Sequence, residues 1–328
     1  MSLNVRPFRS LAALAELVPE IVYVMCGARG EVRNRLTAAL PRVRFLGFEP
    51  DEKAHEHLAR NPPPGHTYHK VAVGKREEAR TLYLTREPAC SSLLKPNASF
   101  FGQFTDCAEQ IEVVEQQTVE TVSLNNFLPG AGVTNFDFLE LDTQGTELDI
   151  LKGADHFLAT SVVGLKIEVE FSPMYEGQPL FGAVDEYLRT FGFMLFDLSR
   201  NRYRRSAMPH DLVTRGQLLW GDAFYLRDYR RFTGSAAKER VLKLCVIAGM
   251  LGFHDYALEA WDFVLQEGGG VVSDIERAAL TTIRMQYLDE LHSHSTWLRM
   301  ASKLQRFGLK GIVRLSRRAR TTAFSWVD

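Results

Sequence analysis

The sequence predicts an α/β fold built on a mostly parallel, doubly wound sheet. Three observations predict it: short apolar runs recur along the first 230 residues, helix-like segments separate them, and Gly or Pro closes many of the runs. Apolar runs of this kind are typical of strands buried on both faces, as in parallel sheets covered by helices. With 328 residues, 45% of them hydrophobic, the chain is long enough to bury such a core.

Strand and helix patterns alternate in the order that this fold requires. The expected strands are 21–26, 45–48, 69–73, 136–141, 162–171, 193–198 and 223–226. The expected helices among them are 31–40, 52–60, 146–152 and 180–190. Two further strands, at 81–85 and 111–122, interrupt the alternation. Pro50 follows the second strand and ends it, because proline has no N–H to donate to a ladder.

Beyond residue 232 the pattern becomes entirely helical. Helices are expected at 238–251, 255–266 and 274–292, so the chain divides into an α/β domain at 1–232 and a helical appendage at 233–328. The appendage ends in a basic tail, with seven Lys or Arg and no acid between residues 303 and 320. A basic amphipathic segment can make weak contact with anionic lipid, and a solvated surface is the alternative.

Composition excludes several classes of protein. The 39 basic and 40 acidic residues balance, which argues against general electrostatic capture of nucleic acid. No apolar run approaches the roughly 18 residues that span a bilayer, and the first nine residues lack the pattern of a signal peptide. The four cysteines have no C-x-x-C spacing and the histidines form no ligand pattern, so no metal site or disulfide framework is predicted. A reducing, cytoplasmic compartment is the simplest interpretation.

The turn after the first expected strand reads Gly27-Ala28-Arg29-Gly30. Glycines let a backbone turn tightly and approach a ligand, and the helix that follows presents unpaired N–H groups. The next strand is followed by Glu49, where an acid commonly accepts hydrogen bonds from ribose hydroxyls. This order of elements predicts a site for a nucleoside-bearing cofactor. A structural βα turn is the alternative, because the full G-x-G-x-x-G pattern is absent.

The stretch FDFLELDTQGTELDILKGA at 136–154, continued by LKIEVEFSPMYEGQPLF at 165–181, resembles the FkbM family of S-adenosylmethionine-dependent methyltransferases. The resemblance spans about residues 20–227 and does not reach the helical C-terminus. The matching elements occur in the family's order, at 27–30, 47–51, 141–148, 151–154, 168–171, 175–179, 192–193, 196–198, 216–218 and 220–223.

The resemblance implies a class I methyltransferase, Rossmann-like, with a mostly parallel seven-stranded sheet whose last strand is antiparallel. It makes 1–232 the methyltransferase domain and S-adenosyl-L-methionine the cofactor. Family members mostly methylate hydroxyl oxygens of sugars, glycolipids or secondary metabolites, so the expected partner is a small-molecule or glycan acceptor. Neither the acceptor nor the oligomeric state follows from the sequence.

The resemblance and the switch-point geometry together select the candidate site residues. The predicted cofactor-binding residues are Gly27, Ala28, Arg29, Gly30, Glu49, Pro50, Ala72, Ser91, Asp142 and Gln144. The predicted catalytic residues are Asp142 and Glu168.

Methyl transfer to a hydroxyl requires a group that takes up the hydroxyl proton. Asp142, at the carboxyl end of the fourth main strand, is the best-placed acid, and capping of the next helix is its alternative role. Lys166, Glu168 and Glu170 alternate along one strand and therefore share a face. Because buried charges must be paired, either Lys166 pairs with Glu168, or a glutamate lines the acceptor pocket.

Two positions depart from the family pattern. Met25 stands where members carry an acid that helps to orient the cofactor, and Asn125 stands where they carry an aspartate. Both departures favour a second hypothesis, a non-catalytic binding protein that keeps the fold. A nicotinamide-dependent oxidoreductase is the third hypothesis, and it lacks support because no suitable Tyr-x-x-x-Lys motif is present.

Overall fold

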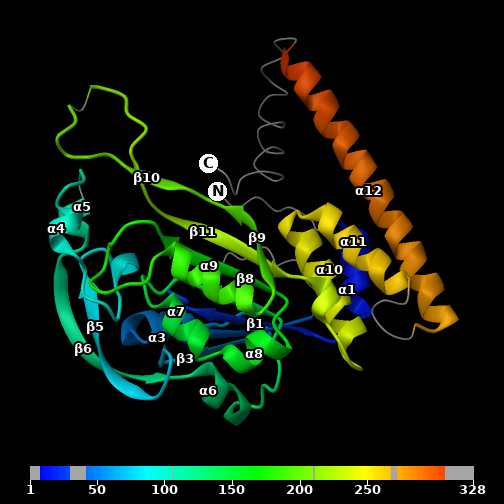
Figure 1. Cartoon of the computed structure of the whole chain (residues 1–328), viewed down its shortest axis with the longest axis horizontal. Helices are drawn as coiled ribbons and strands as arrows, with labels where there is room; N and C mark the ends of the chain where they lie inside the picture. The colour runs from blue at the N-terminus through cyan, green and yellow to red at the C-terminus, as the bar shows by residue number, and fades with distance from the viewer. Residues whose placement is uncertain (1–7, 30–41, 106, 210, 267–271, 307–328) are drawn as a thin grey trace. The chain divides into compact units, whose positions relative to one another are not determined.

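The computed structural model describes residues 8–29, 42–105, 107–209, 211–266 and 272–306, with side chains described as far as residue 296 (Figure 1). The chain divides into a sheet unit, 21–32 with 44–227, and a helical unit, 1–20 and 33–43 with 228–328. Within the described residues, no helix combines the length and apolar character needed to cross a bilayer.

The main sheet of the sheet unit has eight strands, in the order β10-β11-β8-β7-β1-β2-β3, with β9 also paired to β11. Strands β1, β2, β3, β7 and β8 run parallel, and β11 runs antiparallel to β8, β9 and β10. The bounds are β1 Ile21–Cys26, β2 Val43–Phe48, β3 His66–His69, β7 Phe138–Leu141, β8 Gly164–Glu170, β9 Phe193–Leu198, β10 Asn201–Tyr203 and β11 Gln217–Arg227.

This topology confirms the predicted mostly parallel sheet with an antiparallel last strand. The short strand β10 is additional to the predicted seven. It can pair because β11 is 11 residues long, so that one half of it meets β9 and the other half meets β10. The expected strand at 223–226 is therefore only the second half of β11.

A second, three-stranded sheet contains β4 Ala72–Val73, β5 Glu78–Thr85 and β6 Val113–Val122. The sequence predicts β5 and β6, but the single strand predicted at 69–73 is wrong. The chain bends after His69, where β3 ends at the edge of the main sheet, and Ala72–Val73 pairs instead with the end of β6.

Helices flank the sheet strands in the predicted order. The helix α3 is capped by Asp51, the residue before it, whose carboxylate accepts a hydrogen bond from the Ala54 N–H at 2.8 Å. The expected helix at 31–40 lies outside the described residues. The helices of this unit are α3 Glu52–Arg60, α4 Ala98–Phe101, α5 Cys107–Gln110, α6 Leu124–Gly130, α7 Glu147–Lys152, α8 Asp155–Thr160 and α9 Phe181–Thr190, with the 3₁₀ turn η1 Pro88–Cys90.

The central strands are buried on both faces, as their apolar sequences predict. Leu139, Leu141, Leu165, Ile167 and Val169 of β7 and β8 are fully buried and belong to one core cluster. At roughly 25 cal/mol per Å² of apolar area, this burial is the main term that holds the sheet against its helices. The rigid strands in turn fix the loops at their carboxyl ends.

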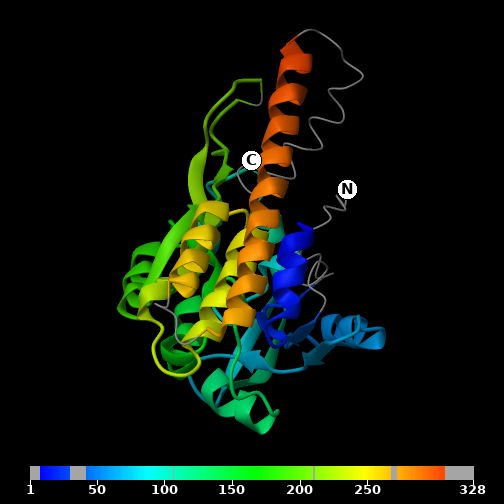
Figure 2. The same ribbon diagram turned by 90° about the vertical axis from the view of Figure 1, so that its right-hand side faces the viewer.

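The helical unit contains α1 Arg9–Glu16, α10 Ala237–Leu251, α11 His254–Leu265 and α12 Asp274–Arg306, with the 3₁₀ turn η2 Tyr229–Arg231 (Figure 2). The three predicted C-terminal helices are present, and α12 extends beyond its predicted end. The sequence does not predict α1, which buries Leu11 and Leu14 and packs against α10 and α12. The basic tail beyond residue 306 lies outside the described residues, so its contact with lipid stays a prediction, as does the domain boundary at residue 232.

Candidate active site

A pocket lies at the carboxyl ends of β1, β2 and β7, the edge where an open parallel sheet binds ligands. It encloses about 730 Å³ with the open space at its mouth included. The lining residues are Cys26, Gly27, Arg29, Phe48, Glu49, Pro50, Val71, Ala72, Val73, Leu82, Pro88, Ala89, Ser91, Ser92, Leu93, Asp142, Thr143, Gln144 and Thr146.

Most of the predicted cofactor residues meet at this pocket. The members of the predicted set that line it are Gly27, Arg29, Glu49, Pro50, Ala72, Ser91, Asp142 and Gln144. Ala28 is fully buried and is not part of the lining. Gly30 lies outside the described residues. Their roles in binding stay predictions.

The turn after β1 requires glycine at its first position. Gly27 has φ +83°, and a Cβ atom placed there would lie 1.8 Å from the backbone oxygen of Asp142. The N–H groups of Gly27 and Ala28 both donate to the Phe48 carbonyl at 3.1 Å, and the Asp142 N–H donates to the Cys26 carbonyl at 3.1 Å. The ends of three strands are thus held together closely, and a ligand can approach the backbone there.

Glu49 directly follows β2 and is only 3% exposed. Its Oε1 accepts a hydrogen bond from the Asp51 N–H at 2.9 Å. Burial raises the pKa of Glu49 to about 7, against the lowering effects of that hydrogen bond and of Arg29. Arg29 itself forms an ion pair with Asp51 at 3.3 Å and donates to the Pro88 carbonyl at 3.3 Å. Arg29 therefore connects the N-cap of α3 with the 3₁₀ turn η1, which contributes Pro88 to the pocket lining.

Gln144 is the centre of a hydrogen-bond network between the pocket and β8. Its Nε2 donates to Asp142 Oδ1 at 2.9 Å and to Glu168, and its Oε1 accepts from the Tyr175 hydroxyl at 2.9 Å. Its backbone carbonyl accepts from Ser92 Oγ at 2.8 Å. Gln144 adopts φ +59°, a conformation that costs of order 1–3 kcal/mol in a non-glycine residue unless its surroundings hold it. The four partners supply that support, and Tyr175 and Ser92 thereby position the loop.

Asp142 presents its carboxylate to the pocket. The protein packed around it raises its pKa, while hydrogen bonds with Gln144 and Glu168 and the charge of Lys166 lower it. A raised pKa makes a carboxylate a stronger base, which suits it to take up a proton. The predicted alternative, a cap on the next helix, is not seen: Thr146 is the residue that precedes α7, and no side chain caps it.

Of the two alternatives for this strand, the Lys166–Glu168 ion pair is not formed. Lys166 Nζ instead lies 3.0 Å from Glu140 Oε1 and 3.3 Å from Asp222 Oδ1. The neighbouring strands cause this choice, because Glu140 of β7 is the direct partner of Lys166 in the register and Asp222 comes from β11 on the other side. Glu168 is buried behind the pocket, and Gln144 connects it to the lining.

Ser91 and Ser92 have different surroundings. Ser91 Oγ accepts a hydrogen bond from the Thr85 N–H at 3.2 Å, as in a plain turn, while Ser92 Oγ reaches across to Gln144. Sequence reasoning also missed Thr143 and Thr146 of the lining. Both belong to the motif at 141–148, and their place directly after a strand is the signal that could have found them.

The two departures from the family pattern lie away from the lining. Met25 is in β1 opposite Glu140 and is absent from the pocket wall. Asn125 is in α6, where its Nδ2 donates to Asp155 Oδ1 at 2.6 Å. Neither substitution blocks the pocket.

The family model described as "Methyltransferase FkbM domain" matches residues 26–195, which is more than half of the chain. The chain belongs to the FkbM methyltransferase family. Its members are S-adenosylmethionine-dependent, so this protein is an S-adenosylmethionine-dependent methyltransferase. No curated protein matches it.

The chain is also similar to several solved structures. They include the precorrin-6y C5,15-methyltransferase of Geobacter metallireducens (10% identity, 67% of this chain and 87% of that one, TM-score 0.33). A TehB-like SAM-dependent methyltransferase of Corynebacterium glutamicum has 11% identity over 69% of this chain and 90% of that one, with a TM-score of 0.29. A SAM-dependent methyltransferase of Anabaena variabilis has 10% identity over 70% and 99%, with a TM-score of 0.31.

The pocket of this methyltransferase fits its cofactor. Gly27 lets the end of β1 lie directly against the backbone of Asp142, an approach that any residue with a Cβ would prevent. Apolar side chains of Val71, Val73, Leu82 and Leu93 form one wall, suited to a planar base, and Glu49 offers carboxylate oxygen to hydroxyl groups. When bound, S-adenosylmethionine supplies an activated methyl group.

Proposed function

We propose that this enzyme methylates a hydroxyl oxygen of a sugar, glycolipid or secondary metabolite, with Asp142 as the base. The observation that supports this proposal is the position of the Asp142 carboxylate, which lines the cofactor pocket and has a raised pKa. An alcohol is a poor nucleophile until its proton leaves, so an oxygen acceptor needs such a group within hydrogen-bond reach.

The residues around Asp142 have different roles in orienting its carboxylate. Gln144 donates to Asp142 and so fixes the direction of its carboxylate, while Tyr175 and Ser92 hold Gln144. Glu168 accepts from the same Gln144 amide and acts as a positioning residue in this scheme. Correct alignment matters because a well-oriented pair of reactants gains several kcal/mol over free encounter.

The cofactor side of the proposal assigns the ribose hydroxyls to Glu49 and the base to the apolar wall. Glu49 Oε1 already accepts from Asp51, so its second oxygen is the one for the ligand. A charge-assisted hydrogen bond of this kind contributes about 1.5–3 kcal/mol.

The test is transfer of an isotopically labelled methyl group from S-adenosylmethionine to a panel of acceptors. The panel should contain glycosides, glycolipids and hydroxylated secondary metabolites, with amine and carboxylic acid analogues as controls. Label that resists mild alkali in an acceptor with hydroxyl groups and no amine supports an ether and hence oxygen methylation of a hydroxyl. Label found only in alkali-labile esters or in amines would refute the proposal.

A further inference from the structure

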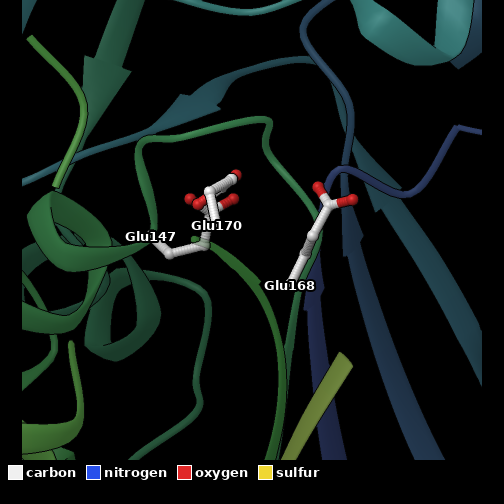
Figure 3. Close-up of side chains that lie close together, drawn as sticks. All are labelled: Glu147, Glu168 and Glu170. Atoms are coloured by element: carbon white, nitrogen blue, oxygen red, sulfur yellow. The ribbon is translucent and has the colours of Figure 1, made fainter. Parts of the chain in front are cut away.

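Three buried glutamates, Glu147, Glu168 and Glu170, lie close together and form what we call the acid cluster. Glu168 and Glu170 alternate along β8 and share a face, and Glu147 is the first residue of α7 (Figure 3). One carboxylate oxygen of each lies within 4.8 Å of the others. The side chains are buried, with exposed fractions of 2% for Glu147, 6% for Glu168 and 3% for Glu170.

The cluster has no cationic side chain of its own. Among the residues whose side chains the structure describes, no Lys, Arg or His forms an ion pair with any of the three glutamates. Lys166, on the same strand, is engaged by Glu140 and Asp222. Buried carboxylates of like charge are costly unless a cation or protons neutralise them.

Glu170 supplies a second and independent observation. Its Oε1 is fully buried and has no hydrogen-bond partner, and its carboxylate lies close to that of Glu147 (Figure 3). Buried polar atoms are almost always paired, so an unpaired carboxylate oxygen that faces other carboxylates indicates a missing ligand.

Glu147 is already oriented for such a ligand. Its Oε1 accepts hydrogen bonds from the N–H and hydroxyl of Thr143, and its Oε2 accepts from the Gly145 N–H at 2.9 Å. With one donor on Oε2, this oxygen retains a lone pair. The bonds hold the carboxylate in one direction, as the outer partners of metal ligands commonly do.

We propose that Glu147, Glu168 and Glu170 bind one hard divalent cation of the Mg²⁺ or Mn²⁺ type. Carboxylate oxygen is the ligand that these ions prefer, and water molecules would complete the coordination. The ion joins β8 to the loop that carries Asp142 and Gln144. Its role is to position that loop by neutralising the carboxylates of the three glutamates.

The test is direct binding of Mn²⁺ to the full-length protein after removal of metals with EDTA. The electron paramagnetic resonance signal of free Mn²⁺ should fall until one ion is bound per chain, and Mg²⁺ in excess should restore it. Bound Mn²⁺ should also raise the melting temperature of the wild-type protein, because a ligand of the folded state stabilises it.

Two isosteric variants and one control make the test specific. Glu170→Gln and Glu168→Gln should each weaken Mn²⁺ binding at least about tenfold, since each removes a charged ligand. Glu176→Gln, an exposed residue of the loop after β8, should bind Mn²⁺ as the wild type does. Circular dichroism checks that each variant is folded.

Failure of the wild-type protein to take up Mn²⁺ would overturn the proposal and leave protons as the neutralising partners of the cluster. Wild-type binding in both Gln variants would overturn it equally. The measurement needs neither cofactor nor acceptor, so its failure is distinguishable from failure of the proposed methyl transfer.

Discussion

Two places in the sheet unit bury glutamate at the carboxyl ends of strands, and they differ in what faces the carboxylate. Glu49, after β2, accepts from the Asp51 N–H and opens onto the pocket. Glu170, at the end of β8, faces other carboxylates and leaves Oε1 without a partner. The same residue type at equivalent ends of parallel strands therefore serves different purposes.

The difference lies in the surroundings. At Glu49 the Asp51 N–H group and the charge of Arg29 partly offset the cost of burial, so a single ligand hydroxyl can complete the site. At Glu170, the nearest charged groups are other carboxylates, and Oε1 has no hydrogen-bond donor. The pocket is thus suited to a hydroxyl donor, and the acid cluster to a cation.

The largest expected effect comes from Gly27→Ala, which disturbs the backbone that forms the edge of the pocket. The added Cβ would lie 1.8 Å from the Asp142 oxygen at a φ of +83°. We expect the free energy of unfolding to fall by about 2–4 kcal/mol, as urea denaturation would measure. Gly182→Ala is the control, because a Cβ there meets no atom within 4 Å. Equal stability of the two variants would contradict the close approach at Gly27.

Asp142→Asn separates chemistry from binding at the pocket. The amide can keep the hydrogen-bond geometry but cannot take up the hydroxyl proton. We expect the turnover number to fall about 10²–10⁴-fold, much more than the affinity for S-adenosylhomocysteine falls. Initial rates and calorimetric titration measure the two quantities. Full turnover in this variant would remove Asp142 from the mechanism.

The pH dependence of cofactor affinity tests the role proposed for Glu49. Its pKa of about 7 means that the ionised form, which accepts strongly from ribose, grows as the pH rises through neutrality. We expect the affinity for S-adenosylhomocysteine to rise about tenfold between roughly pH 6 and 8 in the wild type, and to stay flat in Glu49→Gln. Glu49→Ala should cost about 1–3 kcal/mol of binding free energy at the upper end of that range. The same pH profile in wild type and Glu49→Gln would reject the role.

The same raised pKa affects stability with the opposite sign. The folded protein holds the Glu49 proton more tightly than the unfolded chain, whose carboxyl has the ordinary value of 4.5. The contribution of Glu49 to the free energy of unfolding is therefore present at low pH and is lost as the pH rises from about 4.5 to 7. Glu49→Gln should remove this loss, which denaturation at several pH values would detect.

Asn125→Asp has the smallest expected effect and should alter neither the cofactor pocket nor the acid cluster. It restores the family's residue but places a second carboxylate beside Asp155, to which Asn125 now donates at 2.6 Å. We expect stability to fall by about 0.5–1 kcal/mol and cofactor affinity to stay the same. Thermal unfolding and calorimetry measure both. Tighter cofactor binding would instead show that the departure impairs the site.

Local patterns carried much of the fold prediction. The β-branched run of β1 and the short run of β7, apolar except for Glu140, are recognisable because strands buried on both faces have few polar positions. The strand at 69–73 was predicted wrongly because its division depends on β6, a partner about 50 residues further along the chain. The helix α1 was not predicted because Leu11 and Leu14 form an apolar face that is recognisable only once α10 and α12 pack against it.

The sequence by itself determined the family, the order of strands and helices, and the places where glycine and acid follow a strand. Motif order and hydrophobic period are properties of neighbouring residues, so they can be read without coordinates. Only the tertiary structure decided that Lys166 pairs with Glu140 and Asp222, that Gln144 lies between Asp142 and Glu168, and that three glutamates converge. Such side-chain partnerships depend on strand register and loop conformation, which arise when distant segments pack.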